Sequence, residues 1–207
     1  MKKRKTILII IALVVAIGLL GATYAFFNYY QEGSNQKLIA GQVYLKLNDG
    51  TDTLTMTNMF PETVEEARVE TRTDNIITFS ITGKNTSDTK NVVYNILLNP
   101  GDSVNGRTRL KAKDLKFDLI LVEGNTETLI QSAVSFPTLN ETVIHSGTFN
   151  ANTTNQTTVT YKLRMWIDGN VIISDTLEEA DYSTQVYKNS FASVRVAVSG
   201  DMVTVSE

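Results

Sequence analysis

The chain has 207 residues, a formal net charge of −3 and no cysteine, so a disulfide framework is excluded and stability must come from packing and strand pairing. Four basic residues lie in the first 26 positions, which contain no acidic residue, and the remainder carries 15 basic against 22 acidic residues, a net charge of −7. This balance argues against nucleic acid or an anionic surface as a partner.

The N-terminus has the pattern of an export signal. Four basic residues at Lys2–Lys5 precede an uninterrupted apolar run from Ile7 to Leu20, and small residues follow. A basic stretch that stays in the cytoplasm, an apolar core that enters the bilayer and small residues for a peptidase are what a secretory signal needs. We therefore expect a signal cleavage region at Ala22, Ala25 and Phe26.

Residues 1–26 also fit a retained membrane anchor. Counted from Ile7 through Phe27, the apolar run is 21 residues long, enough for a helix that spans roughly 30 Å of hydrocarbon. The strictly apolar part is shorter, which favours a cleaved signal. In both cases the chain crosses a membrane. We expect a secreted or cell-surface protein that contacts the membrane through residues 1–27 before or without cleavage.

The first half of the exported part alternates apolar and polar residues at period two, which predicts half-buried strands. In chain order, strands are expected around Val43–Leu47, Leu54–Met56, Ile77–Ile81 and Val92–Leu98. Asp49-Gly50 predicts a hairpin turn between the first two strands, and the polar run 83–88 predicts a turn between the last two. Residues 61–74 break the pattern and fit either a short helix that begins at Pro61 or a solvated loop.

The second half continues in the same way. A polar stretch over 99–113 contains the turn signal Asn105-Gly106, and a hairpin is expected from Leu115–Leu121 through Gly124 into Thr128–Ile130. Pro137 interrupts a weaker stretch. The longest strand covers Val159–Ile167, and the turn signal Asp168-Gly169-Asn170 then leads into 171–173. Residues 177–189 are expected to be helical for a turn or two, and Ala192–Val198 forms the last strand.

These elements predict an all-β fold, an antiparallel β-sandwich of jelly-roll-like type over residues 38–207, preceded by the N-terminal apolar signal or anchor helix. One domain is expected because no repeat or low-complexity linker interrupts the pattern. The stripes expected in its core are Phe79/Ile81, Tyr94/Ile96, Phe117/Leu119, Tyr161/Leu163 and Val194/Val196.

Two stretches resemble the TasA/camelysin family of exported proteins of Gram-positive bacteria. The run Thr23-Tyr24-Ala25-Phe26-Phe27-Asn28 followed by Ala40-Gly41-Gln42-Val43-Tyr44-Leu45 is similar to the start of that family. The strand around Phe79 followed by Gly83-Lys84-Asn85-Thr86 is similar to its strand–turn–strand core. The resemblance covers residues 1–100 and the closing strand. It implies processing by a dedicated signal peptidase and a jelly-roll-like sandwich that assembles into extracellular matrix fibres.

Catalytic and metal-binding residues are not expected. Camelysin is described as a metalloprotease, but this chain has one histidine, His145, and no cysteine, so it lacks the paired ligands of a zinc site. We interpret His145 as an ordinary histidine at a strand end. No Gly-x-Ser-x-Gly elbow frames a serine nucleophile. We therefore predict no enzyme activity, no cofactor and no metal.

The sequence gives less support to two binding functions, for calcium and for sugars. Asn48–Asp52 and Asp168–Asn170 collect oxygen atoms near glycines, as calcium prefers, but neither completes an EF-hand loop and turn chemistry explains both. Sugars stack on aromatic rings, and the candidates for such a platform are Trp166, Tyr161 and Tyr44. Trp166 lies on the strand face opposite Tyr161, which favours core or interface packing.

The exported N-terminus predicts assembly. Cleavage near Ala25 or Phe26 leaves the aromatic segment Phe27, Asn28, Tyr29 and Tyr30 at the start of a polar tail, residues 27–37. Three exposed aromatic rings favour burial, and an open sheet edge is a template for another strand. The tail is therefore a candidate donor strand for a neighbouring copy, which builds a head-to-tail polymer. The alternatives are that the tail pairs with its own domain, or that the chain is a membrane-anchored monomer that binds an unknown ligand.

Overall fold

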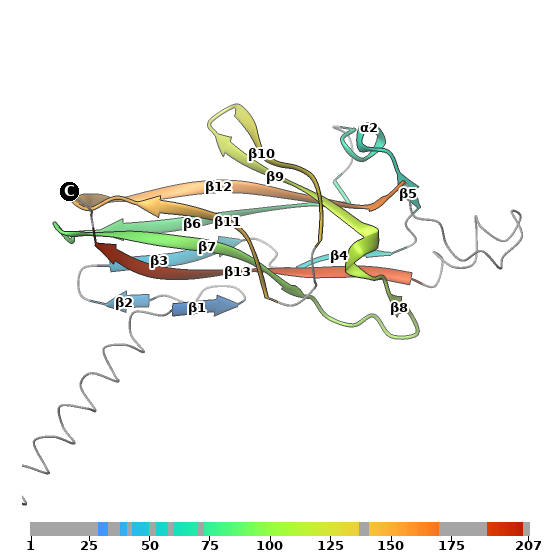
Figure 1. Ribbon diagram of the computed structural model, residues 1–207, viewed down its shortest axis with the longest axis horizontal. Coiled ribbons are helices and arrows are strands. Elements are labelled where there is room, and N and C mark those ends of the chain that lie inside the picture. The colour runs from blue at the N-terminus through green and yellow to red at the C-terminus, as the bar shows by residue number, and fades with distance from the viewer. Residues whose placement is uncertain are drawn as a thin grey trace, which may run out of the picture.

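The computed structural model describes residues 29–32, 38–40, 43–49, 53–57, 60–69, 73–136, 141–169 and 190–204. These residues form two mostly antiparallel β-sheets, and Figure 1 shows the long strands of both sheets running along one axis of the molecule. The all-β, β-sandwich-like fold predicted from period-two alternation is confirmed. The predicted signal or anchor helix lies outside the described residues.

Sheet A has the strand order β1-β13-β7-β11, with β4 and β8 also paired to β13. Its strands are β1 (Tyr29–Glu32), β4 (Thr53–Thr57), β7 (Lys90–Pro100), β8 (Thr108–Arg109), β11 (Thr142–Phe149) and β13 (Ser190–Thr204). The two-residue β8 runs parallel to β13, and the other pairings are antiparallel. β13 is the centre of this sheet because every member except β11 pairs with it.

Sheet B has the order β10-β9-β12-β6-β3-β2, with β5 running parallel to β12. Its strands are β2 (Leu38–Ala40), β3 (Val43–Asp49), β5 (Pro61–Glu62), β6 (Ile76–Asn85), β9 (Leu115–Glu123), β10 (Thr126–Ser135) and β12 (Thr153–Asp168). Two short helices, α2 (Val64–Ala67) and η1 (Ala112–Asp114), complete the described elements. The expected hairpin is β9–β10, with Gly124 at φ 61° in its turn, a conformation that glycine adopts without a steric penalty.

The core lies between the sheets and contains every stripe that alternation predicted. Both members of each predicted pair are buried in one cluster, together with Leu45, Leu47, Leu98 and Met165. Side chains at alternate positions of a strand point to the same face, so β7 and β13 from sheet A meet β6, β9 and β12 from sheet B. Trp166 is also buried, with 1% of its surface exposed, but it lies outside that cluster, as expected from its opposite strand face.

The predicted hairpin at Asp49-Gly50 is wrong, and the turn predicted over 83–88 joins strands of different sheets. β3 and β4 belong to different sheets, and so do β6 and β7, so each connection crosses between sheets instead of closing a hairpin. The turn expected over 83–88 also starts too early, because Gly83 pairs with Leu45 on one side and Thr157 on the other. A Cβ atom at Gly83 would lie 2.3 Å from the ring of Phe149, so glycine here makes room for the core.

Two local expectations are also corrected. His145 lies inside β11 and not at a strand end, because Thr142–Phe149 pairs with β7 along the whole segment that looked weak. The helix begins after Thr63 and not at Pro61, which belongs to β5. Thr63 and Glu66 form a reciprocal capping box that satisfies the free amides of the first turn. The predictions for 170–173 and 177–189 lie outside the described residues.

Candidate assembly site

One edge of β13 pairs with two short strands from the N-terminal part of the described chain. β4 pairs with β13 from Phe191 to Arg195, and β1 pairs with it from Ala197 to Gly200. The two short strands therefore lie one after the other along the same edge. On its opposite side, β13 pairs with β7 from Val194 to Thr204. The β13 backbone is held firmly by β7, whatever occupies the other edge.

The β1 pairing has a definite register. Tyr29 lies opposite Gly200, and Tyr30 lies opposite Ser199. β13 is well buried at this point, since Val196, Ala197 and Val198 expose none of their surface. Beyond Gly200, β13 continues for four residues that pair with β7 but have no strand among the described residues on the β1 side.

The predicted assembly residues are placed in part. Tyr29 and Tyr30 lie in β1, whereas Phe27, Asn28 and the cleavage region Ala22, Ala25 and Phe26 lie outside the described residues. Among the helices of the described residues, none has the length and apolar character needed to cross a bilayer. Within the single chain, β1 pairs with its own domain, which is the alternative stated for the tail.

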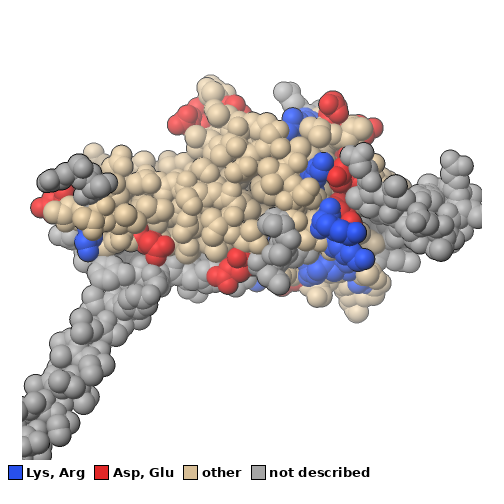
Figure 2. Space-filling model, viewed as in Figure 1, with Lys and Arg blue, Asp and Glu red and all other residues tan. Residues whose placement is uncertain are grey.

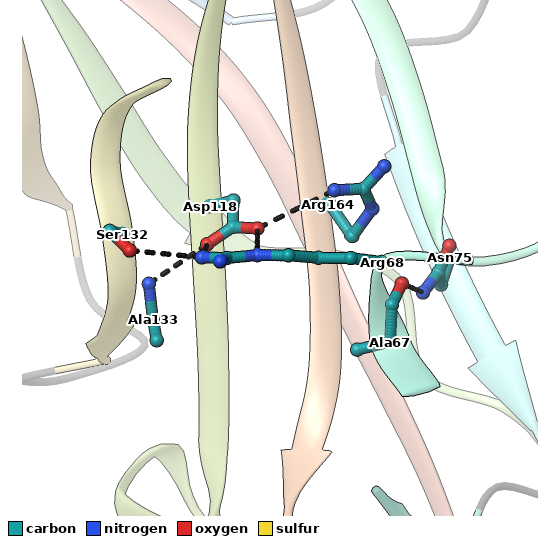
Figure 3. A network of polar contacts seen from close by, with 7 residues as sticks. All are labelled: Ala67, Arg68, Asn75, Asp118, Ser132, Ala133 and Arg164. Atoms are coloured by element: carbon teal, nitrogen blue, oxygen red, sulfur yellow. Dashed lines mark hydrogen bonds and ion pairs between the residues drawn. The ribbon is translucent and has the colours of Figure 1, made fainter. Parts of the chain in front are cut away.

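A buried polar network that sequence reasoning missed lies on sheet B (Figure 3). Asp118 in β9 has a fully buried side chain and receives two hydrogen bonds of 2.8 Å from Arg68, which follows α2. The backbone amide of Ala133 in β10 donates to the same carboxylate at 2.8 Å, and Arg164 in β12 lies 3.5 Å away. The sequence signal was a single acidic residue inside the apolar run of β9.

The electrostatics of this network are those of a structural ion pair. Burial raises the pKa of Asp118, but the hydrogen bond from Arg68, the Ala133 amide and the charges of both arginines outweigh it, so the pKa is lowered overall. The hydrogen bond to Asp118 raises the pKa of Arg68. Because the carboxylate is ionised and its oxygens are occupied, Asp118 is poorly suited to proton transfer. The network ties α2 to the outer surface of sheet B.

His145 lies beside a pair of buried tyrosines. Its ring centroid is 5.7 Å from that of Tyr161, and the Tyr161 hydroxyl lies 2.7 Å from the Tyr94 hydroxyl. Burial lowers the pKa of His145 and raises the pKa of both tyrosines. All three groups are therefore neutral at pH 7. The two tyrosine hydroxyls bind each other, and His145 packs against the Tyr161 ring.

The calcium alternative gains no support from the described residues. Asp168 forms an ion pair with Lys116 at 3.1 Å, and residues 50–52 and 170 lie outside the description. No group of three His, Cys, Asp or Glu side chains close enough to hold a metal ion exists among the residues described. The prediction that no metal is needed for folding stays a prediction.

Charged residues are unevenly distributed on the face shown in Figure 2. Lys and Arg gather at the end where Figure 1 places β8, while the middle of the face over β11 and β12 is uncharged. Part of this basic group is structural, because Arg109 donates to the carbonyl oxygens of Ser193 and Gly101 and lies over the ring of Phe191. The uncharged middle is the larger surface.

The described residues define an all-β protein of two stacked, mostly antiparallel sheets, with a short N-terminal strand on an edge of the first sheet. Comparison with models of known protein families, with curated proteins and with solved structures finds no match. The resemblance to the TasA/camelysin family therefore stays a prediction.

Proposed function

We propose that this protein is an exported structural protein of the bacterial cell surface and the subunit of an extracellular, biofilm-matrix fibre. Neighbouring copies join head to tail when the N-terminal strand of one copy pairs with β13 of the next. The proposal includes membership of the TasA/camelysin family, a jelly-roll-like sandwich and an N-terminal signal helix that is removed on export. In this role the protein is not an enzyme, and its partner is a second copy of itself.

The observation that carries the proposal is the pairing of β1 with the β13 edge. A strand of four residues at the beginning of the exported chain contributes few hydrogen bonds, so its release costs little. The same hydrogen bonds form again when β1 pairs with β13 of another copy, which makes exchange between subunits nearly neutral in pairing energy. Because donor strand and acceptor edge are different surfaces, the contact repeats without closing.

The residues that precede β1 would lengthen a donor strand. In a donor strand that continues the β1 register, Asn28 would pair with Asp201 and Phe27 with Met202, on the stretch of β13 that has no described partner on this side. Cleavage near Ala25 or Phe26 frees these residues from the membrane segment. A donor strand that includes them covers the edge more fully than β1 alone, and the aromatic residues it adds favour burial.

A membrane-anchored monomer that binds an unknown ligand is the second candidate. The observation that favours it is that β1 pairs with β13 of its own chain, which occupies the Ala197–Gly200 part of the edge and keeps another copy from pairing there. In that case residues 1–27 stay in the membrane and hold the domain at the cell surface. N-terminal sequencing of the cell-surface and secreted material separates a processed chain from an anchored one.

The pairing partner of β1 can be identified with a disulfide trap, since the chain contains no cysteine. Tyr30 and Ser199 lie directly opposite each other, within reach of a disulfide. In a Tyr30→Cys/Ser199→Cys variant, pairing between copies gives a ladder of covalent oligomers after oxidation and denaturation, whereas self-pairing gives monomers. The matched control is Tyr30→Cys/Ala197→Cys, in which the two positions are not opposite.

Deletion of residues 27–36 from the processed chain tests assembly by strand donation without a disulfide cross-link. The proposal expects the truncated protein to remain folded and to lose fibres in electron micrographs. Fibres as abundant as those of the intact processed chain would rule out assembly by strand donation. In the disulfide experiment, a product that consists only of internally cross-linked monomers would support the anchored monomer.

A further inference from the structure

The strand β11 is an edge of sheet A, with β7 on one side and no strand among the described residues on the other. An unpaired strand edge is a template for another strand, and proteins usually protect it with charges, proline, bulges or a covering element. β11 contains no charged residue and no proline in its eight residues. It therefore lacks the common side-chain devices that prevent strand addition.

Most other edges of the two sheets are short or irregular. β10 has two register shifts and a residue of positive φ, Ala133 at 51°, and its Glu127 is paired with Lys162. β2 is only three residues long, and the free edge of β13 is the one that β1 and β4 share. Irregular or short edges pair poorly with a partner strand. Among the described residues, the regular edge strands without charges that exceed three residues are β11, with eight residues, and β4, with five, so β11 is the longer of the two.

The regular part of β11 runs from His145 to Phe149. The single register shift lies between Val143 and His145, and there the side-chain amide of Gln131 donates to the carbonyl oxygen of Ile144 at 3.4 Å. From His145 onward, each residue has one partner in β7, down to Phe149 opposite Val92. Five consecutive residues thus offer a straight backbone edge, and the shifted end is closed by Gln131.

We propose that β11 pairs antiparallel with β11 of a second copy, with Gly147 at the centre of the pair, and that this contact joins neighbouring fibres side by side. The inference rests on the proposed fibre. Centring on Gly147 is the antiparallel register that pairs all five regular residues with all five of the partner strand. It places Ser146 opposite Thr148 and His145 opposite Phe149, so no like charges meet.

The side chains fit this register. Ser146 and Thr148 are exposed, and hydroxyl side chains directly opposite each other are favourable across an antiparallel pair. Gly147 has no side chain at the two-fold centre, because a Cβ there would lie 2.2 Å from the ring and hydroxyl of Tyr94. Phe149 is buried in the core and stays there. The new contact consists of main-chain hydrogen bonds and an outer row of hydroxyls.

The small size of the contact fits side-by-side association of fibres. Five paired residues bury far less than the roughly 1,200–2,000 Å² of a stable protein–protein interface, so isolated copies associate weakly through β11. In a fibre the same edge repeats along the length, and many weak contacts add up once two fibres are aligned. β11 pairing therefore bundles fibres and does not create a stable dimer on its own.

A charge placed on this edge tests the bundling. Thr148→Lys adds an exposed lysine to β11, and the matched control Thr128→Lys adds one to the irregular edge strand β10, at a residue that is also exposed. In electron micrographs of the processed chain, we expect single fibres for Thr148→Lys and wild-type bundles for Thr128→Lys. Thermal unfolding midpoints check that both variants fold. Wild-type bundling of Thr148→Lys, or dispersal by both variants, overturns the proposal.

A second measurement does not depend on fibres. The proposed register puts Ser146 opposite Thr148 of the partner strand, so a mixture of full-length Ser146→Cys and Thr148→Cys chains should form disulfide dimers at several times the yield of either variant alone. Equal yields in the mixture and in the single variants overturn the register. If the wild-type chain forms no fibres while the mixed pair is still trapped, the fibre proposal fails and the β11 contact stands.

Discussion

The hydroxyl oxygens of Tyr94 and Tyr161 lie 2.7 Å apart in the core and join the two sheets by a hydrogen bond. Tyr94 belongs to β7 in sheet A, and Tyr161 belongs to β12 in sheet B. Both residues are buried, with Phe149 packed on the first ring and Phe79 stacked on the second. Each hydroxyl is the partner that lets the other be buried without loss of a hydrogen bond.

Removal of one of these hydroxyls should cost more than removal of both. Tyr94→Phe leaves the Tyr161 hydroxyl buried without its partner, which should lower the free energy of unfolding by about 1–3 kcal/mol. The double variant Tyr94→Phe/Tyr161→Phe leaves no unpaired group and should be closer to wild type than either single variant. Urea denaturation of the four proteins measures the coupling. Additive losses would show that the hydroxyls act independently.

The predicted core stripes can be tested with a pair of leucines. Leu163 exposes none of its surface, whereas Leu129 exposes 42%. Truncation of Leu163 to alanine removes buried contacts and leaves a cavity, so the free energy of unfolding should fall by about 2–5 kcal/mol. Leu129→Ala deletes the same atoms from an edge strand and should cost far less. Equal denaturant midpoints for the two variants would contradict the assignment of Leu163 to the core.

Period-two alternation predicts the face of a strand but not its partner. The stripes through Phe79, Tyr94 and Tyr161 were predicted correctly because burial of one strand face follows from local sequence alone. The hairpin predicted between β3 and β4 was wrong, and the turn predicted between β6 and β7 did not reveal a change of sheet, because a turn signal says that the chain reverses, not whether it returns to the same sheet. That choice depends on contacts between residues far apart in the sequence.

The polar features of the fold were least predictable. Asp118 is distinctive in the sequence only as an acid within an apolar strand, and its partner Arg68 is 50 residues away. No strand was predicted around His145, which was placed at a strand end, yet β11 pairs with β7 from Thr142 to Phe149 with one register shift. Its glycine is required by the ring of Tyr94, which comes from another strand. Local propensity does not contain such tertiary requirements.

His145 should make the stability of the protein pH-dependent. Burial lowers its pKa in the folded state, so the unfolded chain, with a pKa of about 6.5, takes up the proton more readily. The contribution of His145 to stability is therefore complete above about pH 6.5 and declines as the pH falls below that value.

His145→Gln removes this titration and provides the comparison. Between pH 7.5 and pH 5.5, the thermal unfolding midpoint of the wild type should fall further than that of the variant. Because the acidic side chains are common to both proteins, their titration cancels in the difference. Parallel curves, or a wild type that gains stability on acidification, would show that the protonated imidazole finds a favourable partner in the fold.

Two aspartates in ion pairs with arginine should differ strongly in their effect on stability. The side chain of Asp118 is fully buried and binds Arg68, the Ala133 amide and Arg164, whereas that of Asp102 is 82% exposed and binds Arg195 at 3.0 Å. Loss of one partner of a buried pair leaves the other charge uncompensated and costs about 3–5 kcal/mol. Asp118→Ala should approach the lower end, because the Arg68 side chain is 32% exposed and water can solvate its guanidinium.

Asp102→Ala is the matched control, since an exposed ion pair contributes roughly 0–1 kcal/mol. Urea denaturation at neutral pH gives both free energies. A further substitution, Arg68→Leu, should recover part of the loss in Asp118→Ala because it removes one of the two uncompensated charges beside the missing carboxylate. Similar small losses for both aspartate variants would mean that this network does not hold α2 to sheet B. If Arg68→Leu recovers no stability in the Asp118→Ala background, the hydrogen bond from the Ala133 amide, and not the arginine charge, is the contact that matters.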